Sequence, residues 1–323
     1  MTVVPDPRPA TTSATGEPSP TLARVVRVLD ELYPPSTAEG WDAVGLVAGD
    51  PGAPVRKVLF AVDPVEEVAD EALAWGADLL VTHHPLFLRP VHSVAATTFK
   101  GSLVHRLIRG GCALYVAHTN ADAAGRGVAD ALADALDLLH RIPLVPHPTG
   151  SPHVASTTGT GRVGRLAEPT TLRAFAQRVA EVLPATVQGV RVAGDLDARV
   201  ESVAVVGGSG DSLFDAVRAS GADVYLTSDL RHHPVSELRE RARLEGGEAG
   251  TPFLVDVPHY ASEWPWLRYA AEDLVRALAP APGGSSTAGV ETRVSTLVTD
   301  PWTARVASVP AAGGAEHVTD RAP

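Results

Sequence analysis

Short apolar runs alternate with amphipathic stretches along most of the chain. Continuously apolar runs of strand length lie at residues 58–62, 79–82 and 113–117, and helical periodicity marks residues 22–32, 64–75, 103–109 and 127–138. Asp63 stands where an N-cap would begin the helix over 64–75, and Gly76 stands where that helix would end. Strands that are apolar throughout are typical of a parallel sheet covered by helices on both faces. The pattern therefore predicts an α/β fold with a largely parallel sheet.

The chain also contains an internal repeat. Residues 55–84 align without gaps with residues 200–229, and 8 of the 30 aligned positions are identical. More loosely, each half continues into an apolar strand followed by His-x-x-x-acid, at His118…Asp122 and at His259…Glu263. We expect two related α/β domains whose corresponding loops lie at the carboxyl ends of their strands, where open α/β sheets bind ligands.

The expected domain boundaries follow from these patterns. We expect a first α/β domain, with most of the metal ligands, from residues 22–140 plus 252–303, and a second α/β domain from residues 141–251. Residues 279–289 are rich in Pro, Ala, Gly and Ser and are typical of a linker, and residues 292–298 fit a late strand. We expect disordered tails at residues 1–21 and 304–323.

Composition excludes several classes of protein. The only cysteine, Cys112, cannot form an intrachain disulfide, and one thiol cannot build a Cys-rich zinc site or an iron–sulfur cluster. A net charge of -11 argues against sequence-independent binding of nucleic acid. No apolar segment has the length of a membrane span, and the N-terminus does not read as a signal peptide, so we expect no membrane contact and a cytoplasmic location. Any metal site must use His, Asp or Glu, and the chain has 12 His.

Three strand ends carry candidate metal ligands. His83 and His84 follow one buried strand, Asp122 follows the next, and His259 with Glu263 follows a third. Each has an ordinary alternative: a locally hydrogen-bonded pair, a helix N-cap or a surface pair. Together, three imidazoles and two carboxylates exceed what one tetrahedral ion with an open position needs, and they suit two ions bridged by a carboxylate. This donor set does not choose between Zn, Mn, Fe, Co and Ni.

These motifs resemble a known family, the type-two GTP cyclohydrolase I homologues, also called NIF-three-like or dinuclear-metal-centre hexameric proteins. The resemblance extends over about residues 22–303 and rests on five segments: VTHHP at 81–85, HTNAD at 118–122, GGSG at 207–210, TSDL at 227–230 and HYASE at 259–263. Several ordered motifs at matching positions make the resemblance specific.

The resemblance implies a NIF-three-like fold and a metal centre. By this resemblance two divalent ions per subunit are held by His83, His84, Asp122, His259 and Glu263, and Glu263 is the bridge. His118 lies outside the family's ligand set; we expect it to orient the site and to be the first candidate for a general acid or base, beside Glu263 as the other catalytic residue. The family also implies self-association into a toroidal homohexamer.

Two functions fit this resemblance. The first is a metal-dependent hydrolase that acts on GTP or on another nucleotide or phosphoester. The alternative is a metal-binding or interaction scaffold without catalysis.

Two departures and one further motif leave the substrate open. Ala43 stands where the family usually has Asn, and Pro258 stands where it often has Gly; neither position is a ligand, but both could alter the rim of the pocket. His232 and His233 have two interpretations: they contact a phosphate or base from across the cavity, or they are a hydrogen-bonded pair that begins a helix.

Overall fold

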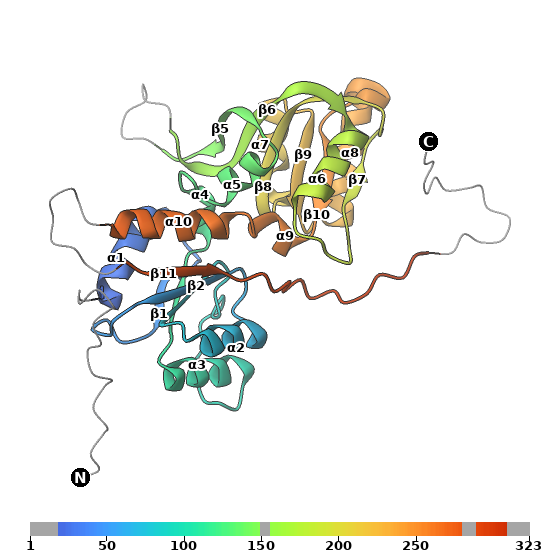
Figure 1. Ribbon diagram of the computed structural model, residues 1–323. Coiled ribbons are helices and arrows are strands. Elements are labelled where there is room, and N and C mark those ends of the chain that lie inside the picture. The colour runs from blue at the N-terminus through green and yellow to red at the C-terminus, as the bar shows by residue number, and fades with distance from the viewer. Residues whose placement is uncertain (1–18, 149–155, 280–288, 309–323) are drawn as a thin grey trace, which may run out of the picture.

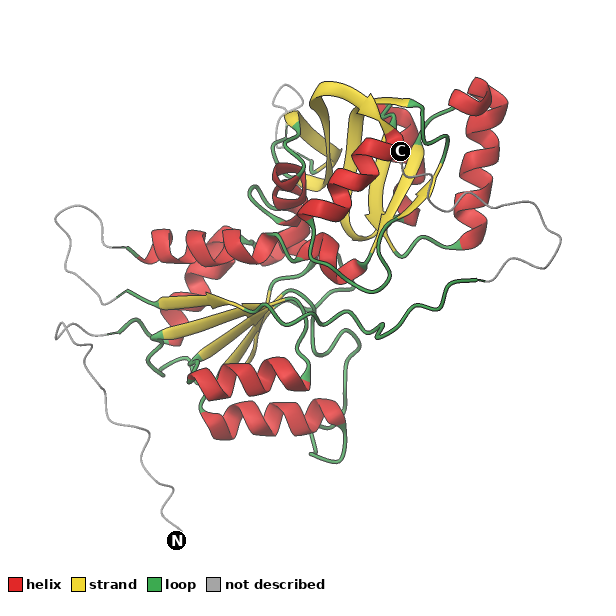
Figure 2. Cartoon of the chain, turned by 45° about the vertical axis from the view of Figure 1, so that its right-hand side comes forward, coloured by secondary structure: helices red, strands yellow, loops and turns green. Residues whose placement is uncertain are grey.

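The computed structural model describes residues 19–148, 156–279 and 289–308 (Figure 1). The expectations for most of the two tails and for the linker concern residues outside these ranges. The described chain forms two sheets, each with helices on both faces (Figure 2), which confirms the predicted two-part α/β fold.

The first sheet has the strand order β1-β4-β3-β2-β11. Its strands are β1 (Gly45–Ala48), β4 (Ala113–Val116), β3 (Leu79–Thr82), β2 (Lys57–Ala61) and β11 (Glu291–Val294). Only β1, at one edge, is antiparallel to its neighbour. Alternate side chains point to opposite faces, so one face packs against α2 (Glu66–Trp75) and α3 (Phe99–Gly110). The other face packs against α1 (Leu22–Leu32) and α10 (Trp266–Leu278).

The second sheet has the order β5-β6-β8-β9-β10-β7. Its strands are β5 (Leu139–Pro146), β6 (Gly159–Thr171), β8 (Arg199–Ser209), β9 (Val224–Ser228), β10 (Phe253–Val257) and β7 (Arg191–Ala193). The central strands β8, β9 and β10 are parallel. Helices α7 (Phe214–Ser220) and α8 (His232–Gly246) cover one face, and α5 (Val128–Ala135) and α6 (Leu172–Val182) cover the other.

The segment 252–303, which we expected in the first domain, is divided between the sheets. Strand β10 pairs with β9 and β7 in the second sheet, whereas β11 pairs with β2 in the first. Helix α10 lies between the two sheets, and one apolar core contains side chains from both (Figure 1). The chain therefore crosses back between the two halves within this segment.

The sequence repeat is also a structural repeat. The units β2–α2–β3 and β8–α7–β9 match, and both helices end at a glycine in the left-handed region, Gly76 (φ 74°) and Gly221 (φ 70°). In the first unit one carboxylate oxygen of Asp78 accepts the backbone N–H groups of residues 56 and 57, at 2.8 and 3.1 Å. In the second, Asp223 accepts those of residues 201 and 202, at 2.9 and 2.8 Å. Each aspartate thus fixes the start of the neighbouring parallel strand.

Two local expectations were wrong. Helix α2 begins at Glu66 with Val65 as its N-cap residue, so Asp63 does not cap it; its carboxylate accepts a hydrogen bond from His84 instead. Helix α3 begins at Phe99, four residues before the predicted start, because the Thr98 side chain accepts a hydrogen bond from the backbone N–H of Gly101.

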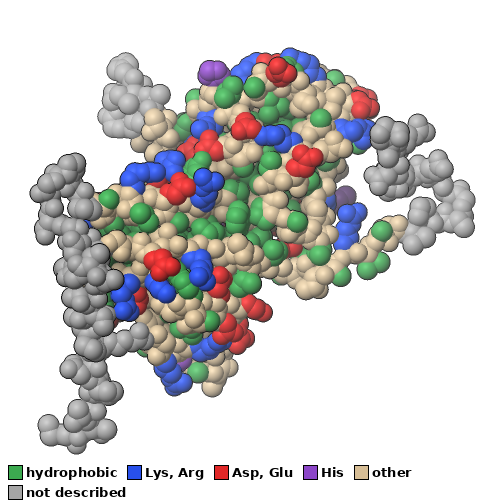
Figure 3. Space-filling view, viewed as in Figure 1, with side chains coloured by type: hydrophobic (Ala, Val, Ile, Leu, Met, Phe, Trp, Pro, Cys, Tyr) green, Lys and Arg blue, Asp and Glu red, His purple; other side chains and the backbone are tan. Residues whose placement is uncertain are grey.

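On the face seen in Figure 3, basic and acidic side chains are interspersed over both halves of the fold. Within the described residues, no helix has both the length and the apolar character that crossing a membrane requires.

We predict that Asp223→Ala lowers the free energy of unfolding by about 1–3 kcal/mol, because it leaves the two N–H groups at the start of β8 without their acceptor. Urea unfolding followed by circular dichroism measures the change. Asp215→Ala is the matched control, since Asp215 is exposed in the same repeat unit. Equal effects of the two substitutions would contradict the role given to Asp223.

Candidate metal centre

The carboxyl ends of β3, β4 and β10 converge between the two sheets and bring the candidate ligands together. His83 and His84 still hydrogen-bond to strand β2 through their backbone, at 3.1 Å to Ala61 O and 2.8 Å to Val62 O. Their rings nevertheless lie on the same side of the site, with centroids 5.1 Å apart. This is the arrangement we expected where a strand leaves its sheet.

Glu263 lies at the centre of the cluster. Its side chain is only 3% exposed, and its Oε1 is 3.0 Å from Nε2 of His259 and 3.4 Å from Nε2 of His83. Its Oε2 is 2.9 Å from Nε2 of His84. His259 and Glu263 are the first and last residues of α9 (His259–Glu263), so their spacing of four puts them on one face, as expected. One carboxylate thus contacts three imidazoles.

Each of these imidazoles also forms a hydrogen bond through its other ring nitrogen, Nδ1. The Nδ1 acceptor is Ala117 O at 2.9 Å for His83, Asp63 Oδ1 at 2.7 Å for His84, and Asp229 Oδ2 at 2.6 Å for His259. A hydrogen bond at Nδ1 fixes the ring and, in the neutral tautomer, leaves the Nε2 lone pair free to bind a cation. All three Nε2 atoms face Glu263.

Asp122 and His118 also lie next to His83. Asp122, on α4 (Thr119–Ala123), places its Oδ1 3.6 Å from Nε2 of His83. The His118 ring contacts the rings of His83 and His84 edge-on, with centroids 5.2 and 5.8 Å away. In the described part of the chain, two groups of three potential ligand atoms lie within 4.8 Å of one another: His83, His84 and His118, and His84, His259 and Glu263.

His118 therefore lies within reach of a cation bound beside His83 and His84, although the resemblance places it outside the ligand set. Its Nδ1 is 3.0 Å from a carboxylate oxygen of the buried Asp42, whose same oxygen also accepts from the Thr119 hydroxyl. Burial and the positive charge of His83 lower the pKa of His118 to about 4, although Asp42 opposes this. His118 is thus neutral near pH 7 and can accept a proton or bind a cation through Nε2.

The cluster fits a divalent cation on its own geometry. Within the cluster, Nε2 of His83 and Oδ1 of Asp122 are buried without a hydrogen-bond partner, and the buried Oε2 of Glu263 faces Nε2 of His84 at 2.9 Å. Buried polar atoms without partners are costly unless something else binds them. Space for a ligand is also kept by Gly208, where a Cβ would stand 2.6 Å from Glu263 Oε1 and 3.1 Å from His259 Nε2.

Without a cation, protons balance the charge of Glu263. Burial alone would raise the pKa of Glu263, but His84, His259 and His83 outweigh it and hold that pKa well below its usual value. Burial alone would lower the pKa of His84 and His259, but Glu263 with Asp63 and Asp229 raises them to about 10 and about 11. The cation-free site therefore holds a carboxylate among imidazolium groups near pH 7.

The pKa of Asp122 is shifted in the opposite direction to that of Glu263. Burial raises the pKa of Asp122 to about 7, with His83 opposing this and Glu263 adding to it. The two carboxylates of the site therefore differ in charge near neutral pH, Glu263 being ionised and Asp122 partly protonated. A bound cation would favour the ionised form of both.

The segment after β11 passes α9, the helix that carries His259 and Glu263 (Figure 1). Its backbone carbonyls accept from Nε1 of Trp264, at Ser295, and from the hydroxyl of Tyr260, at Leu297. The Thr299 hydroxyl donates to Asp63, the residue that holds His84. A cavity of about 250 Å³ opens beside His84 and His259 under this segment.

Sequence analysis missed three carboxylates that hold the histidines: Asp42, Asp63 and Asp229. Two of them carried a usable signal. Asp229 directly follows strand β9 and is the counterpart of His84 in the repeat, and Asp63 lies two residues after strand β2. Both therefore stand at the sheet edge that carries the predicted ligands, whereas Asp42 lies in a loop and carried no such signal.

A comparison with protein families matches residues 20–301 to Duf34/NIF3 (NGG1p interacting factor 3). Among curated proteins, a GTP cyclohydrolase 1 type 2 homolog of Streptomyces coelicolor is 55% identical over 293 residues, which cover 90% of this chain and 96% of that protein. One from Mycobacterium tuberculosis is 35% identical and covers 87% of this chain and 96% of its own length.

Solved structures agree with this fold. A Bacillus cereus protein related to NIF3 superposes with a TM-score of 0.75 at 26% identity, covering 88% of this chain and 99% of that one. Reduced HcgD from Methanocaldococcus jannaschii gives a TM-score of 0.62 at 27% identity, covering 79% and 93%.

We predict that binding of Mn²⁺ or Zn²⁺ releases protons and tightens as pH rises from about 6 to about 9, by up to roughly tenfold per pH unit for each proton released. The sign follows from the raised pKa of His84 and of His259, because a cation competes with protons for Nε2. Calorimetry in two buffers of different ionisation enthalpy counts the protons.

His259→Gln should reduce this proton release, whereas the control His92→Gln, at an exposed position outside the site, should not. Heats independent of the buffer, together with an affinity that does not change with pH, would contradict the exchange of protons for metal.

Proposed function

The chain belongs to the Duf34/NIF3 family, and from this membership and the geometry of the cluster we propose that it is a dinuclear, divalent-metal-dependent hydrolase of a nucleotide or another phosphoester. The relatives named GTP cyclohydrolase 1 type 2 homolog make GTP the first substrate to test.

One observation carries the proposal: the buried carboxylate of Glu263 faces three imidazole Nε2 atoms whose Nδ1 atoms are all held by acceptors. A cluster that only stabilised the fold would gain from replacing such charges by apolar side chains, since buried ion pairs are costly. A cation site instead requires these donors, fixed in this orientation.

The proposed ligands divide between two positions. We assign His83 and Asp122, whose Nε2 and Oδ1 are 3.6 Å apart, to one position, and His84 and His259, whose Nε2 atoms are 3.2 Å apart, to the other. Glu263 contacts all three imidazoles and would bridge the two positions. When bound, a pair of divalent cations supplies Lewis acidity for a carbonyl, C=N or phosphoryl group and lowers the pKa of water toward neutrality.

The other residues orient the site and handle protons. Asp63 and Asp229 hold the rings of His84 and His259, and Asp42 holds that of His118. His118 is our candidate for the general base, because its ring lies 5.2 and 5.8 Å from the rings of His83 and His84 and is neutral near pH 7. The cavity beside His84 and His259 gives a substrate access to the cluster.

We predict that Glu263→Gln lowers metal-dependent turnover by more than about 100-fold, because it removes the carboxylate that the three imidazoles share. The assay screens GTP, other nucleotides and phosphodiesters with and without added Mn²⁺ or Zn²⁺. Glu67→Gln is the control, since Glu67 is exposed on α2. Circular dichroism must show that both variants keep the fold.

Turnover that survives in Glu263→Gln would contradict the proposed mechanism. Metal binding by the natural chain without turnover of any of these substrates would contradict the hydrolase and favour the alternative, a non-catalytic metal-binding or interaction scaffold. The cytoplasmic location stays a prediction of the sequence.

We also propose that the chain assembles with itself into the toroidal homohexamer that the family resemblance implies. Light scattering coupled to size-exclusion chromatography should give a native mass close to six times that of one chain. A monomer across the accessible concentration range would contradict this assembly, and it would leave the metal centre unaffected because one chain supplies every ligand named above.

A further inference from the structure

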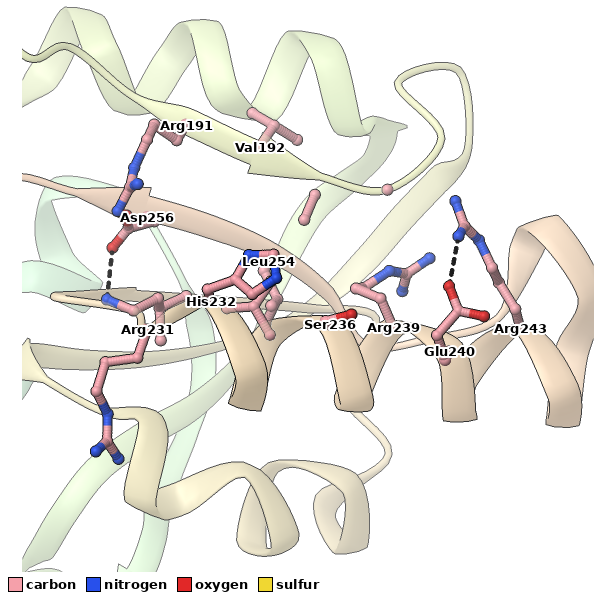
Figure 4. A pocket seen from close by; sticks show the side chains of 14 residues that line it. Arg191, Val192, Arg231, His232, Ser236, Arg239, Glu240, Arg243, Leu254 and Asp256 are labelled. Atoms are coloured by element: carbon pink, nitrogen blue, oxygen red, sulfur yellow. Dashed lines mark hydrogen bonds and ion pairs between the residues drawn. The ribbon is translucent and has the colours of Figure 1, made fainter.

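A second cavity, of about 490 Å³, lies between β7, β10 and the first turns of α8 (Figure 4). Its charged lining consists of four arginines and two carboxylates: Arg191, Arg231, Arg239, Arg243, Glu240 and Asp256. The cavity thus carries an excess of two positive charges, although the whole chain has a net charge of -11.

Three of these arginines are paired and exposed. Arg191 pairs with Asp256, Arg231 pairs with Asp211, and Arg243 pairs with Glu240. Their side chains are 68%, 75% and 49% exposed. The pair of Arg243 with Glu240 is exposed on both sides and therefore weak, so Arg243 can turn toward a ligand at little cost. Arg191 and Arg231 stay beside Asp256 and Asp211, which are 10% and 9% exposed, and offer their exposed guanidinium groups from there.

Arg239 differs from the other three because it is buried, at 7% exposed, and forms no ion pair with a described residue. Its Nη1 donates to the backbone carbonyls of Gly250 and Pro252, both at 2.7 Å, and its guanidinium lies over the Phe253 ring, 5.0 Å from the centroid. These contacts lock the side chain in place. Nε and Nη2 make no hydrogen bond within the described residues.

The environment of Arg239 also disfavours its charge. Burial and the nearby Arg243 lower the pKa of Arg239 from its usual value. A buried guanidinium without a carboxylate partner is costly, and a bound anion would remove that cost. Its Nε and Nη2 groups form the planar pair of donors that matches two oxygens of a phosphate.

We propose that this cavity binds an oxyanion of the phosphate type, with Arg239 as the buried recognition group and Arg191, Arg231 and Arg243 as further donors at its exposed side. His232, the first residue of α8, lines the cavity, and the amino end of this 15-residue helix adds to the attraction for an anion. His233 is not among the lining residues, so the two histidines, weighed together in the sequence, differ in role.

A third cavity lies between the arginine cavity and the metal centre. An intermediate cavity of about 630 Å³ shares Arg191, Leu230 and Asp256 with the arginine cavity. It shares Gln188, Asp229 and Trp302 with the cavity that opens beside His84 and His259. The three cavities therefore lie next to one another along β10.

The length of β10 indicates the size of a substrate that could reach both sites. Arg239 bonds to Pro252, just before β10, and His259 follows two residues after its end, so the five residues of the strand separate the two sites by about 17 Å. Resting on the proposed function, this spacing selects a substrate with an extended, phosphate-bearing chain, its reacting group at the cluster and a phosphate in the arginine cavity.

Calorimetric titration of the metal-free, full-length chain with inorganic pyrophosphate tests the site independently of metal and turnover. We expect Arg239→Gln to weaken binding by about tenfold or more, through the lost charge-assisted bonds. Ser236→Phe should do the same by filling the cavity without changing its charge, which keeps the test valid if Arg239→Gln fails to fold. Arg241→Gln, on the same helix but paired with Glu245 outside the cavity, should bind as the natural chain does.

Absence of pyrophosphate binding by the natural chain would overturn the proposal, as would equal binding by Ser236→Phe. Binding that depends on Arg239 and Ser236 in a chain that turns over no substrate would uphold the anion site and count against the hydrolase alone.

Discussion

The rest of the structure depends on one buried carboxylate that faces three imidazoles. Glu263 brings a negative charge between two sheets, where its burial is costly unless positive charge surrounds it. Protons on His84 and His259 supply that charge in the cation-free chain, and a divalent cation can replace them. Because these histidines come from both halves of the fold, this charge balance also joins the halves.

The internal repeat explains how such a cluster is assembled. In both units the second parallel strand ends at the edge of its sheet that faces the cluster. The first unit places His83 and His84 there, and the second places Ser228 and Asp229 at the corresponding positions. The same position therefore supplies a ligand in one half and the support of a ligand in the other, since Asp229 holds His259. Further along this second half, β10 leads from the cluster to the arginine cavity.

Much of this arrangement could be predicted from the sequence because ligands at strand ends follow a local rule. The apolar runs before His83 and before His118 indicated both the strands and the edge at which the side chains meet. The pairing of β10 with the second sheet could not be predicted, because strand pairing is a long-range choice between similar apolar segments. Asp63 was misjudged because its position before a helix is typical of an N-cap, whereas its actual partner, His84, is 21 residues away.

Anomalous diffraction from crystals grown with Mn²⁺ or Zn²⁺ tests the central claim most directly. The account predicts two anomalous peaks in each subunit, one on either side of the Glu263 carboxylate, with His83 and Asp122 beside one and His84 and His259 beside the other. Crystals saturated with metal that show no anomalous peak next to Glu263 would contradict the account.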